Sequence, residues 1–116
     1  MQNESSIDVR IYYPRLTREE ILQQLRASSQ ELSKVVNLLE MRLFGSYAKG
    51  TNTASSDVDI FIVFEGYDKD EVYSKCWQII GIPEAEIHLY TRRERDQMKK
   101  NHSLFLKEIE ATGISV

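Results

Sequence analysis

The chain has 116 residues, of which 41% are hydrophobic and 28% charged, and its formal net charge is −3. This length predicts one globular domain with a modest core and leaves no room for a second. The acidic balance, with a pI near 5.4, argues against a protein that holds long nucleic acid, because such proteins usually carry a basic face. The single cysteine, Cys76, excludes an internal disulfide framework, and we expect it in the core.

The sequence also predicts a cytoplasmic protein without a membrane segment. No stretch approaches the ~20 consecutive apolar residues that a membrane-spanning helix needs. The first residues, Met1 to Ser6, lack the basic and apolar regions of a signal peptide.

The amino-terminal segment differs from the rest of the chain. Residues 7–13 are rich in β-branched and aromatic side chains and stop at Pro14, a pattern typical of an edge strand or an extended arm. We therefore assign residues 1–16 to an arm or edge strand and residues 17–116 to a single domain.

The next predicted elements are a helix and a strand. Thr17 and Glu20 have the spacing of a capping box, and apolar residues at helical spacing extend this helix to about Val36, with a break near residues 28–29. Apolar and polar side chains alternate over residues 39–44. This alternation predicts a first strand that ends directly before Gly45 and Ser46.

Three further elements follow a polar loop. Five consecutive apolar residues, 60–64, predict a buried second strand, and a helical pattern then ends at Gly81. Alternation over residues 85–91 predicts a third strand. On that strand Glu86 and His88 share one face, while the apolar residues between them can pack on helices.

Two helices are predicted to close the chain. Residues 92–100 carry five positive and two negative side chains, and this helix face is either solvated or binds a substrate or a partner. A short helix from Leu104 should end at Gly113 and leave residues 114–116 as a stub. Together the elements predict an α+β fold of α/β-like character, in which a small mixed sheet of three to four strands packs with helices.

Residues 43–64 join a glycine–serine turn to two alternate aspartates, and they are the best guide to function. Asp57 and Asp59 stand at the entrance of the second strand, where positions i and i+2 share a face. Carboxylates whose backbones lie about 6–7 Å apart can converge on one divalent cation or bridge a metal pair. This arrangement favours phosphoryl-transfer chemistry.

The glycine half of the segment fits the same chemistry. Gly45 lets backbone amides approach an anion, so we expect Gly45 and Ser46 to hold phosphates. Ser46 should begin a short helix, and Lys49 supplies a cation one turn later. Gly50 should end that turn.

Three other kinds of site do not fit these residues. A nucleotide-binding P-loop needs lysine and a hydroxyl residue directly after its second glycine, whereas Lys49 precedes Gly50. An EF-hand loop needs oxygen ligands beyond its first aspartates, whereas residues 60–63 are apolar. A phosphatase with an aspartyl nucleophile typically carries its D-x-D pair after an apolar strand, whereas here the pair precedes the strand.

The turn and the aspartates together resemble a known signature. Its residues here are Gly45, Ser46, Ala48, Lys49, Gly50, Ser56, Asp57 and Asp59. At this spacing they are similar to the pattern G-S-x-A-(R/K)-G followed by S-D-x-D of the DNA polymerase β-like nucleotidyltransferase superfamily, and most similar to its minimal nucleotidyltransferase branch. A weaker similarity covers residues 87–91 and 105–114, and only the first seventeen residues look foreign.

The resemblance implies a site for a nucleoside triphosphate and two magnesium ions, with manganese as the alternative ion. Asp57 and Asp59 would be metal-binding and catalytic, together with a third carboxylate from a later strand. We assign that third position to Glu86, where relatives often carry aspartate. His88 would line or tune the site, because magnesium prefers oxygen donors.

The same resemblance implies transfer of a nucleoside monophosphate, AMP from ATP, onto an acceptor hydroxyl with release of pyrophosphate. Relatives of this branch are often paired with a small helical HEPN-type protein in toxin–antitoxin modules, so we expect an antitoxin that modifies a partner protein. The alternative is a degenerate fold that sequesters a partner or senses nucleotide without transfer. The departure at Glu86 supports this alternative.

Overall fold

The computed structural model describes residues 16–116, and the arm or edge strand predicted at residues 7–13 lies outside this part. The helices and strands in chain order are α2 (Arg18–Ser33), β1 (Asn37–Phe44), α3 (Gly45–Lys49), β2 (Val58–Glu65), α4 (Lys69–Ile80), β3 (Ala85–Thr91), α5 (Arg92–Lys100), α6 (Leu104–Thr112) and β4 (Ile114–Ser115).

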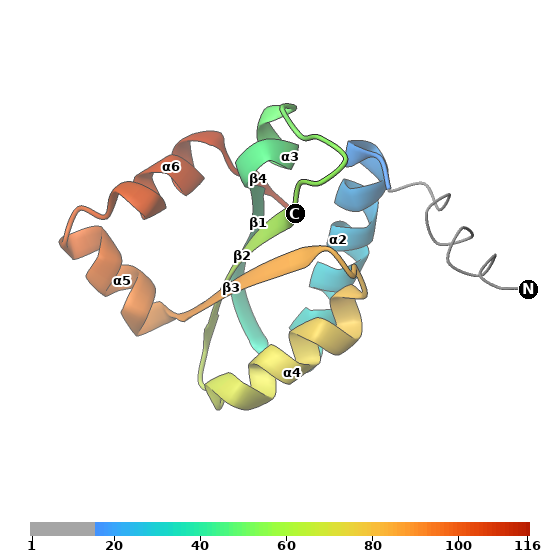
Figure 1. The fold of residues 1–116 in the computed structure, drawn as a ribbon. Helices are drawn as coiled ribbons and strands as arrows, with labels where there is room; N and C mark the ends of the chain where they lie inside the picture. The colour runs from blue at the N-terminus through green and yellow to red at the C-terminus, as the bar shows by residue number, and fades with distance from the viewer. Residues whose placement is uncertain (1–15) are drawn as a thin grey trace, which may run out of the picture.

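The strands form one mixed sheet in the order β3-β2-β1-β4. Strand β1 pairs antiparallel with β2 and with β4, whereas β2 and β3 are parallel and are connected through α4. Helices α2 and α4 lie on one side of the sheet, and α5 and α6 lie on the other (Figure 1). The predicted α+β fold with a small mixed sheet is confirmed.

Strand β2 is the centre of the core. Its residues 60–64 are all 0% exposed, because helices cover both faces of the strand. Phe64 packs in a cluster with residues of α2 and α4, and Phe61 packs in a second cluster with Leu106 and Ile109 of α6. Burial on both faces explains why this strand has a continuous apolar run rather than an alternating pattern.

Helix α2 is unbroken, so the break predicted near residues 28–29 is wrong. Ser28 is buried, and its hydroxyl donates to the carbonyl of Gln24 at 2.8 Å. This bond to the preceding turn satisfies the serine inside the helix. The predicted capping box at Thr17 is present, and the helix ends at Ser33, three residues before the expected Val36.

Residues 114–116 do not form the expected stub. Ile114 pairs with Leu43 and Ser115 with Arg42, and the amide of Val116 donates to the carbonyl of Met41 at 3.0 Å. The short segment therefore adds strand β4 beside β1. Three residues are too few to show a periodic pattern, so only the tertiary pairing reveals this strand.

Cys76 lies in the core, as predicted. Burial raises the pKa of its thiol to about 11. Helix α4, which carries it, ends at Gly81 with a left-handed φ of 62°, the expected stop. Among the described residues, no helix is both long enough and apolar enough to cross a membrane.

Candidate active site

Three of the predicted site residues meet at the beginning of strands β2 and β3. The parallel register pairs Asp59 with Glu86 and Phe61 with His88, which places the polar side chains on one face. Nε2 of His88 lies 3.6 Å from Oδ1 of Asp59 and 3.4 Å from Oε1 of Glu86. One ligand atom from each of the three side chains lies within 4.8 Å of the other two.

The glycine turn lies directly against this group. Strand β1 ends with Phe44 paired to Asp59, and the next residue, Gly45, has a φ of +73°. A Cβ atom on Gly45 would collide with the carboxylate of Asp59 and approach its Cγ to 3.3 Å. The turn therefore needs glycine both for its backbone conformation and for the space that the carboxylate occupies.

Burial and like charge act together on Asp59. Its pKa is raised above the ordinary value, first by burial of the carboxyl and then by the negative charge of Glu86, and His88 opposes this shift. A carboxylate that is partly removed from water beside a second carboxylate is stabilised by a cation. Two carboxylates and an imidazole are a donor set that fits a divalent metal ion.

Asp57 lies just outside this group. It is exposed and immediately precedes Val58, the first residue of β2, so the pleat of the strand does not fix its direction. Its charge is still close enough to contribute to the raised pKa of Asp59. The structure thus brings Asp59 and Glu86 together and leaves Asp57 beside them on the loop.

The short helix after the turn differs from expectation at its start. Helix α3 begins at Gly45 with Phe44 as its N-cap, so the predicted start at Ser46 is wrong by one residue. The carbonyl of Ser46 accepts bonds from the turn that closes the helix, and Gly50 ends it in the left-handed conformation as predicted. Nζ of Lys49 forms an ion pair at 2.5 Å with Glu108 of α6.

Arg18 supports the turn, a role that no sequence pattern predicted. Its guanidinium donates to the carbonyls of Tyr47 and Ala48, at 3.0 Å each. These carbonyls lie in the last turn of α3, where no helical amide follows to bond them. Arg18 is 29 residues before Tyr47 and 30 before Ala48 in the sequence. No local sequence pattern can indicate a contact over that separation, so only the fold identifies it.

Two aromatic rings hold the imidazole of His88. The ring of Phe44 stands edge-on to it at a centroid distance of 5.0 Å, and the ring of Phe105 from α6 lies at 5.7 Å. Phe105 also contacts Phe44 at 5.6 Å. Phe105 was not among the predicted site residues, because the apolar pattern of α6 indicates only that this residue can pack against the rest of the domain.

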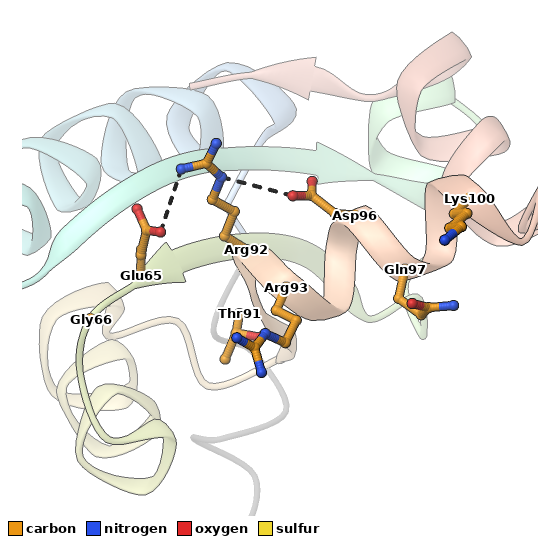
Figure 2. A pocket seen from close by; sticks show the side chains of 8 residues that line it. All are labelled: Glu65, Gly66, Thr91, Arg92, Arg93, Asp96, Gln97 and Lys100. Carbon is orange, nitrogen blue, oxygen red and sulfur yellow. Dashed lines mark hydrogen bonds and ion pairs between the residues drawn. The ribbon is translucent and has the colours of Figure 1, made fainter.

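The basic helix α5 lies apart from the acidic group. Arg92 forms ion pairs with Glu65 and with Asp96, at 3.4 Å and 3.8 Å, beside a hollow of about 650 Å³ (Figure 2). The hollow is lined by Glu65, Gly66, Thr91, Arg92, Arg93, Asp96, Gln97 and Lys100. Glu65 ends β2 and Asp59 lies at its start, so the two ends are separated by roughly 20 Å along the strand. The structure therefore does not bring the basic helix to the predicted site residues.

Part of the chain is similar in sequence to a curated protein. A 50-residue segment is 44% identical to the protein from Thermococcus cleftensis named protein adenylyltransferase MntA, and it covers 43% of this chain and 50% of that protein. The chain thus spans about half the length of the curated relative that it matches.

A solved structure shares the fold. A crystal structure of a candidate nucleotidyltransferase from Sulfolobus solfataricus is 19% identical, with a TM-score of 0.59 over 98% of this chain and 87% of the other. A mutant of the toxin–antitoxin MntA–HpeT is also 19% identical, with a TM-score of 0.44 over 86% and 72%. The family model described as nucleotidyltransferase domain matches residues 22–111, well over half of the chain. The chain therefore belongs to the nucleotidyltransferase domain family.

Proposed function

We propose that this chain is a metal-dependent nucleotidyltransferase that moves AMP from ATP onto a hydroxyl group of a partner protein. The observation that carries the proposal is the contact between the glycine turn and the acidic group. Gly45 is adjacent to Asp59, and Asp59 is paired with Glu86, so the glycine turn and two carboxylates lie together. Family membership and the name of the Thermococcus relative, an adenylyltransferase, support the same chemistry.

The turn would hold the β- and γ-phosphates of the triphosphate. Gly45 leaves room for an anion to approach the backbone, and Ser46 offers a hydroxyl beside it. Lys49 would add a positive charge after exchanging Glu108, its present partner, for a phosphate oxygen. Both side chains of that ion pair are about half exposed, at 43% and 52%, so exchange costs little.

The carboxylates would hold the metal. Asp57, Asp59 and Glu86 fit divalent cations through their oxygens, and a bound cation would neutralise charge at the attacking and leaving oxygens. The side chain of Glu86 is 54% exposed and can be reached by an acceptor. A carboxylate oxygen of Glu86 would accept the proton of the acceptor hydroxyl.

The transfer would proceed as an in-line displacement at phosphorus. The acceptor oxygen forms a bond to the α-phosphorus of ATP, and the bond from that phosphorus to the bridging oxygen breaks. The products are AMP joined to the acceptor and pyrophosphate. The contribution of the protein is the alignment of the two oxygens around the phosphorus.

The acceptor proposed is a small helical partner of the HEPN type, with this chain as the antitoxin of a cytoplasmic two-component module. The resemblance to the minimal branch of the family suggests it. A partner protein can bring its own hydroxyl group to the exposed edge of the site.

The second candidate is a binding module without transfer. The position of Asp57 favours it, because this aspartate is exposed and outside the group formed by Asp59, Glu86 and His88. Such a module would bind its partner or a nucleotide and leave the partner unmodified.

Transfer is tested with ATP labelled at the α-phosphate and the partner encoded beside this chain. The proposal predicts label on the partner and release of pyrophosphate, both lost in Asp59→Asn. Asp70→Asn, which changes an exposed aspartate of α4, is the matched control and should retain transfer. A partner that binds tightly but stays unlabelled would support the binding module instead.

A further inference from the structure

We infer that His88 is a metal ligand together with Asp59 and Glu86, and that the site therefore selects a first-row transition-metal ion such as Mn²⁺ over Mg²⁺. The inference rests on the proposed function only in that both place a metal at the beginning of β2 and β3. It assigns His88 a direct role, whereas the sequence predicted that His88 would only line or tune the site.

The three donor atoms are spaced as ligands of one ion. Nε2 of His88 is 3.6 Å from Oδ1 of Asp59 and 3.4 Å from Oε1 of Glu86. Two ligands that are each about 2.1 Å from one ion lie between about 3 Å and 4.2 Å apart, depending on the angle at the ion. Both observed distances fall in this range. Both are also longer than a normal charged hydrogen bond, so a direct bond between the side chains does not account for them.

The imidazole nitrogen faces the carboxylates of Asp59 and Glu86 at ion-pair distance, without a hydrogen bond to either in the part of the chain that the structure describes. Nε2 of His88 is buried, and no hydrogen bond to residues 16–116 satisfies it. Buried polar atoms in folded proteins are nearly always paired, and an exception calls for an explanation such as an ion that binds there. Neutral imidazole nitrogen is also the commonest protein ligand for metals.

The ring is held in the orientation that a ligand needs. Phe44 contacts its edge at 5.0 Å, with 67° between the planes, and Phe105 lies at 5.7 Å. Packing against the rings of Phe44 and Phe105 limits rotation of the His88 side chain, and strand pairing fixes the backbone of His88 opposite Phe61. Nε2 therefore stays directed at the carboxylates rather than turning toward solvent.

The nitrogen donor determines which ion fits. Mg²⁺ is bound almost entirely through oxygen and releases water reluctantly, whereas Mn²⁺, Co²⁺ and Zn²⁺ accept imidazole beside carboxylate. A site built from Asp59 and Glu86 alone would suit Mg²⁺. The addition of His88 shifts the preference toward the transition metals.

Pulsed electron paramagnetic resonance of the full chain loaded with Mn²⁺ alone tests the inference. Magnetic coupling between Mn²⁺ and a ¹⁴N nucleus is expected in the wild type and should disappear in His88→Gln. We also expect Mn²⁺ affinity to fall at least about tenfold in His88→Gln, since even groups that only orient a metal ligand contribute about 10–100-fold to affinity. Mg²⁺ affinity should change less than Mn²⁺ affinity.

His102→Gln is the matched control, because His102 is the other histidine of the chain and is exposed in the turn between α5 and α6. This variant should keep the nitrogen coupling. Bound Mn²⁺ without nitrogen coupling in the wild type, or coupling that persists in folded His88→Gln, would overturn the inference. In that case binding of ATP with Mg²⁺ would leave the proposed function intact. Nitrogen coupling in a protein that binds no ATP would instead support the metal site and count against the transfer reaction.

Discussion

At the scale of single residues, the contact between Gly45 and Asp59 explains why the turn and the aspartate occur together. Both Gly45 and Gly50 have positive φ angles, +73° and +77°, so alanine strains the backbone at either position. Only at Gly45 would the added Cβ meet the carboxylate of Asp59, since nothing lies within 4 Å of a Cβ at Gly50. Comparison of alanine variants at the two positions therefore distinguishes the effect of backbone strain from the effect of a clash with Asp59.

We predict that Gly45→Ala abolishes metal-dependent ATP binding, whereas Gly50→Ala retains it. Both variants should lose about 1–2 kcal/mol of stability from the left-handed backbone, as measured by urea unfolding. Binding is measured by titration calorimetry on variants shown to be folded. Equal loss of binding in both variants would mean that strain, and not the contact with Asp59, controls the site.

The alternation on the strands predicted which faces Asp59 and Glu86 occupy, whereas the choice of Glu86 as the third carboxylate came from the resemblance to the family. The sequence was insufficient to predict the contacts of His88 and Arg18. The role of His88 depends on how close three side chains come across two strands, and that of Arg18 on a contact 29 residues away. Residue patterns report the direction of a side chain along one element, but not the distance to a neighbour on another.

At the scale of elements, the start of α5 contains a titratable capping box. The backbone amide of Thr91 donates to Glu94 at 2.8 Å, and Lys69 lies 2.9 Å from the same carboxylate. The pKa of Glu94 is lowered, first by the bond from Thr91 and further by Lys69, despite some burial. A lowered carboxyl pKa contributes stability at neutral pH that is lost as the pH falls through the folded-state value.

We predict that Glu94→Gln destabilises the protein at pH 7 by less than about 1 kcal/mol, because both side chains of its pair with Lys69 are nearly half exposed to solvent. The difference from wild type should shrink below pH 4.5, the ordinary value for this carboxyl, as Glu94 takes up a proton. Urea unfolding at pH 7 and at about pH 3 measures both differences. A difference that is independent of pH would show that the charge of Glu94 contributes nothing.

The ion pair between α3 and α6 gives a prediction for Lys49. If Lys49 binds phosphate, Glu108 competes for its charge, so Glu108→Gln should tighten ATP binding by up to about fivefold, which corresponds to about 1 kcal/mol. Glu110 lies on the same helix as Glu108 and pairs at 3.4 Å with Lys99 of α5, so Glu110→Gln is the control and should leave affinity unchanged. Unchanged affinity in Glu108→Gln as well would remove Lys49 from the phosphate site.

Most elements could be predicted because their apolar patterns are long, as in the continuous apolar run of β2 and the helical period of α4. The errors occur where tertiary contacts override a local signal. The serine pair in α2 suggested a break, but Ser28 bonds back to Gln24. Strand β4 has two residues and exists only through its pairing with β1.

At the scale of the whole molecule, the central strand joins two hydrophobic clusters. We propose that residues 17–116 unfold as one unit, and Phe61→Ala tests this, because Phe61 packs toward α6 whereas the single tryptophan, Trp77, lies on α4. The substitution should cost about 3–5 kcal/mol. Fluorescence of Trp77 and far-UV circular dichroism should report the same transition.

Tyr67→Ala is the matched surface control, because Tyr67 is 52% exposed, and it should shift stability by less than about 0.5 kcal/mol. Suppose that the fluorescence of Trp77 in Phe61→Ala showed the wild-type unfolding transition while circular dichroism showed a destabilised one. The helices on the two sides of the sheet would then unfold as independent units. The assignment of one domain would then be wrong.

Calorimetric titration of ATP into the full chain and into Asp59→Asn, with Mn²⁺, with Mg²⁺ and with a chelator, is the decisive experiment for a nucleotide site at Asp59. We expect saturable binding to the wild type that requires a divalent ion and that is lost in Asp59→Asn. Binding that is unaffected by the chelator, or no ATP binding by folded wild-type protein with either metal, would contradict a metal-dependent nucleotide site at Asp59.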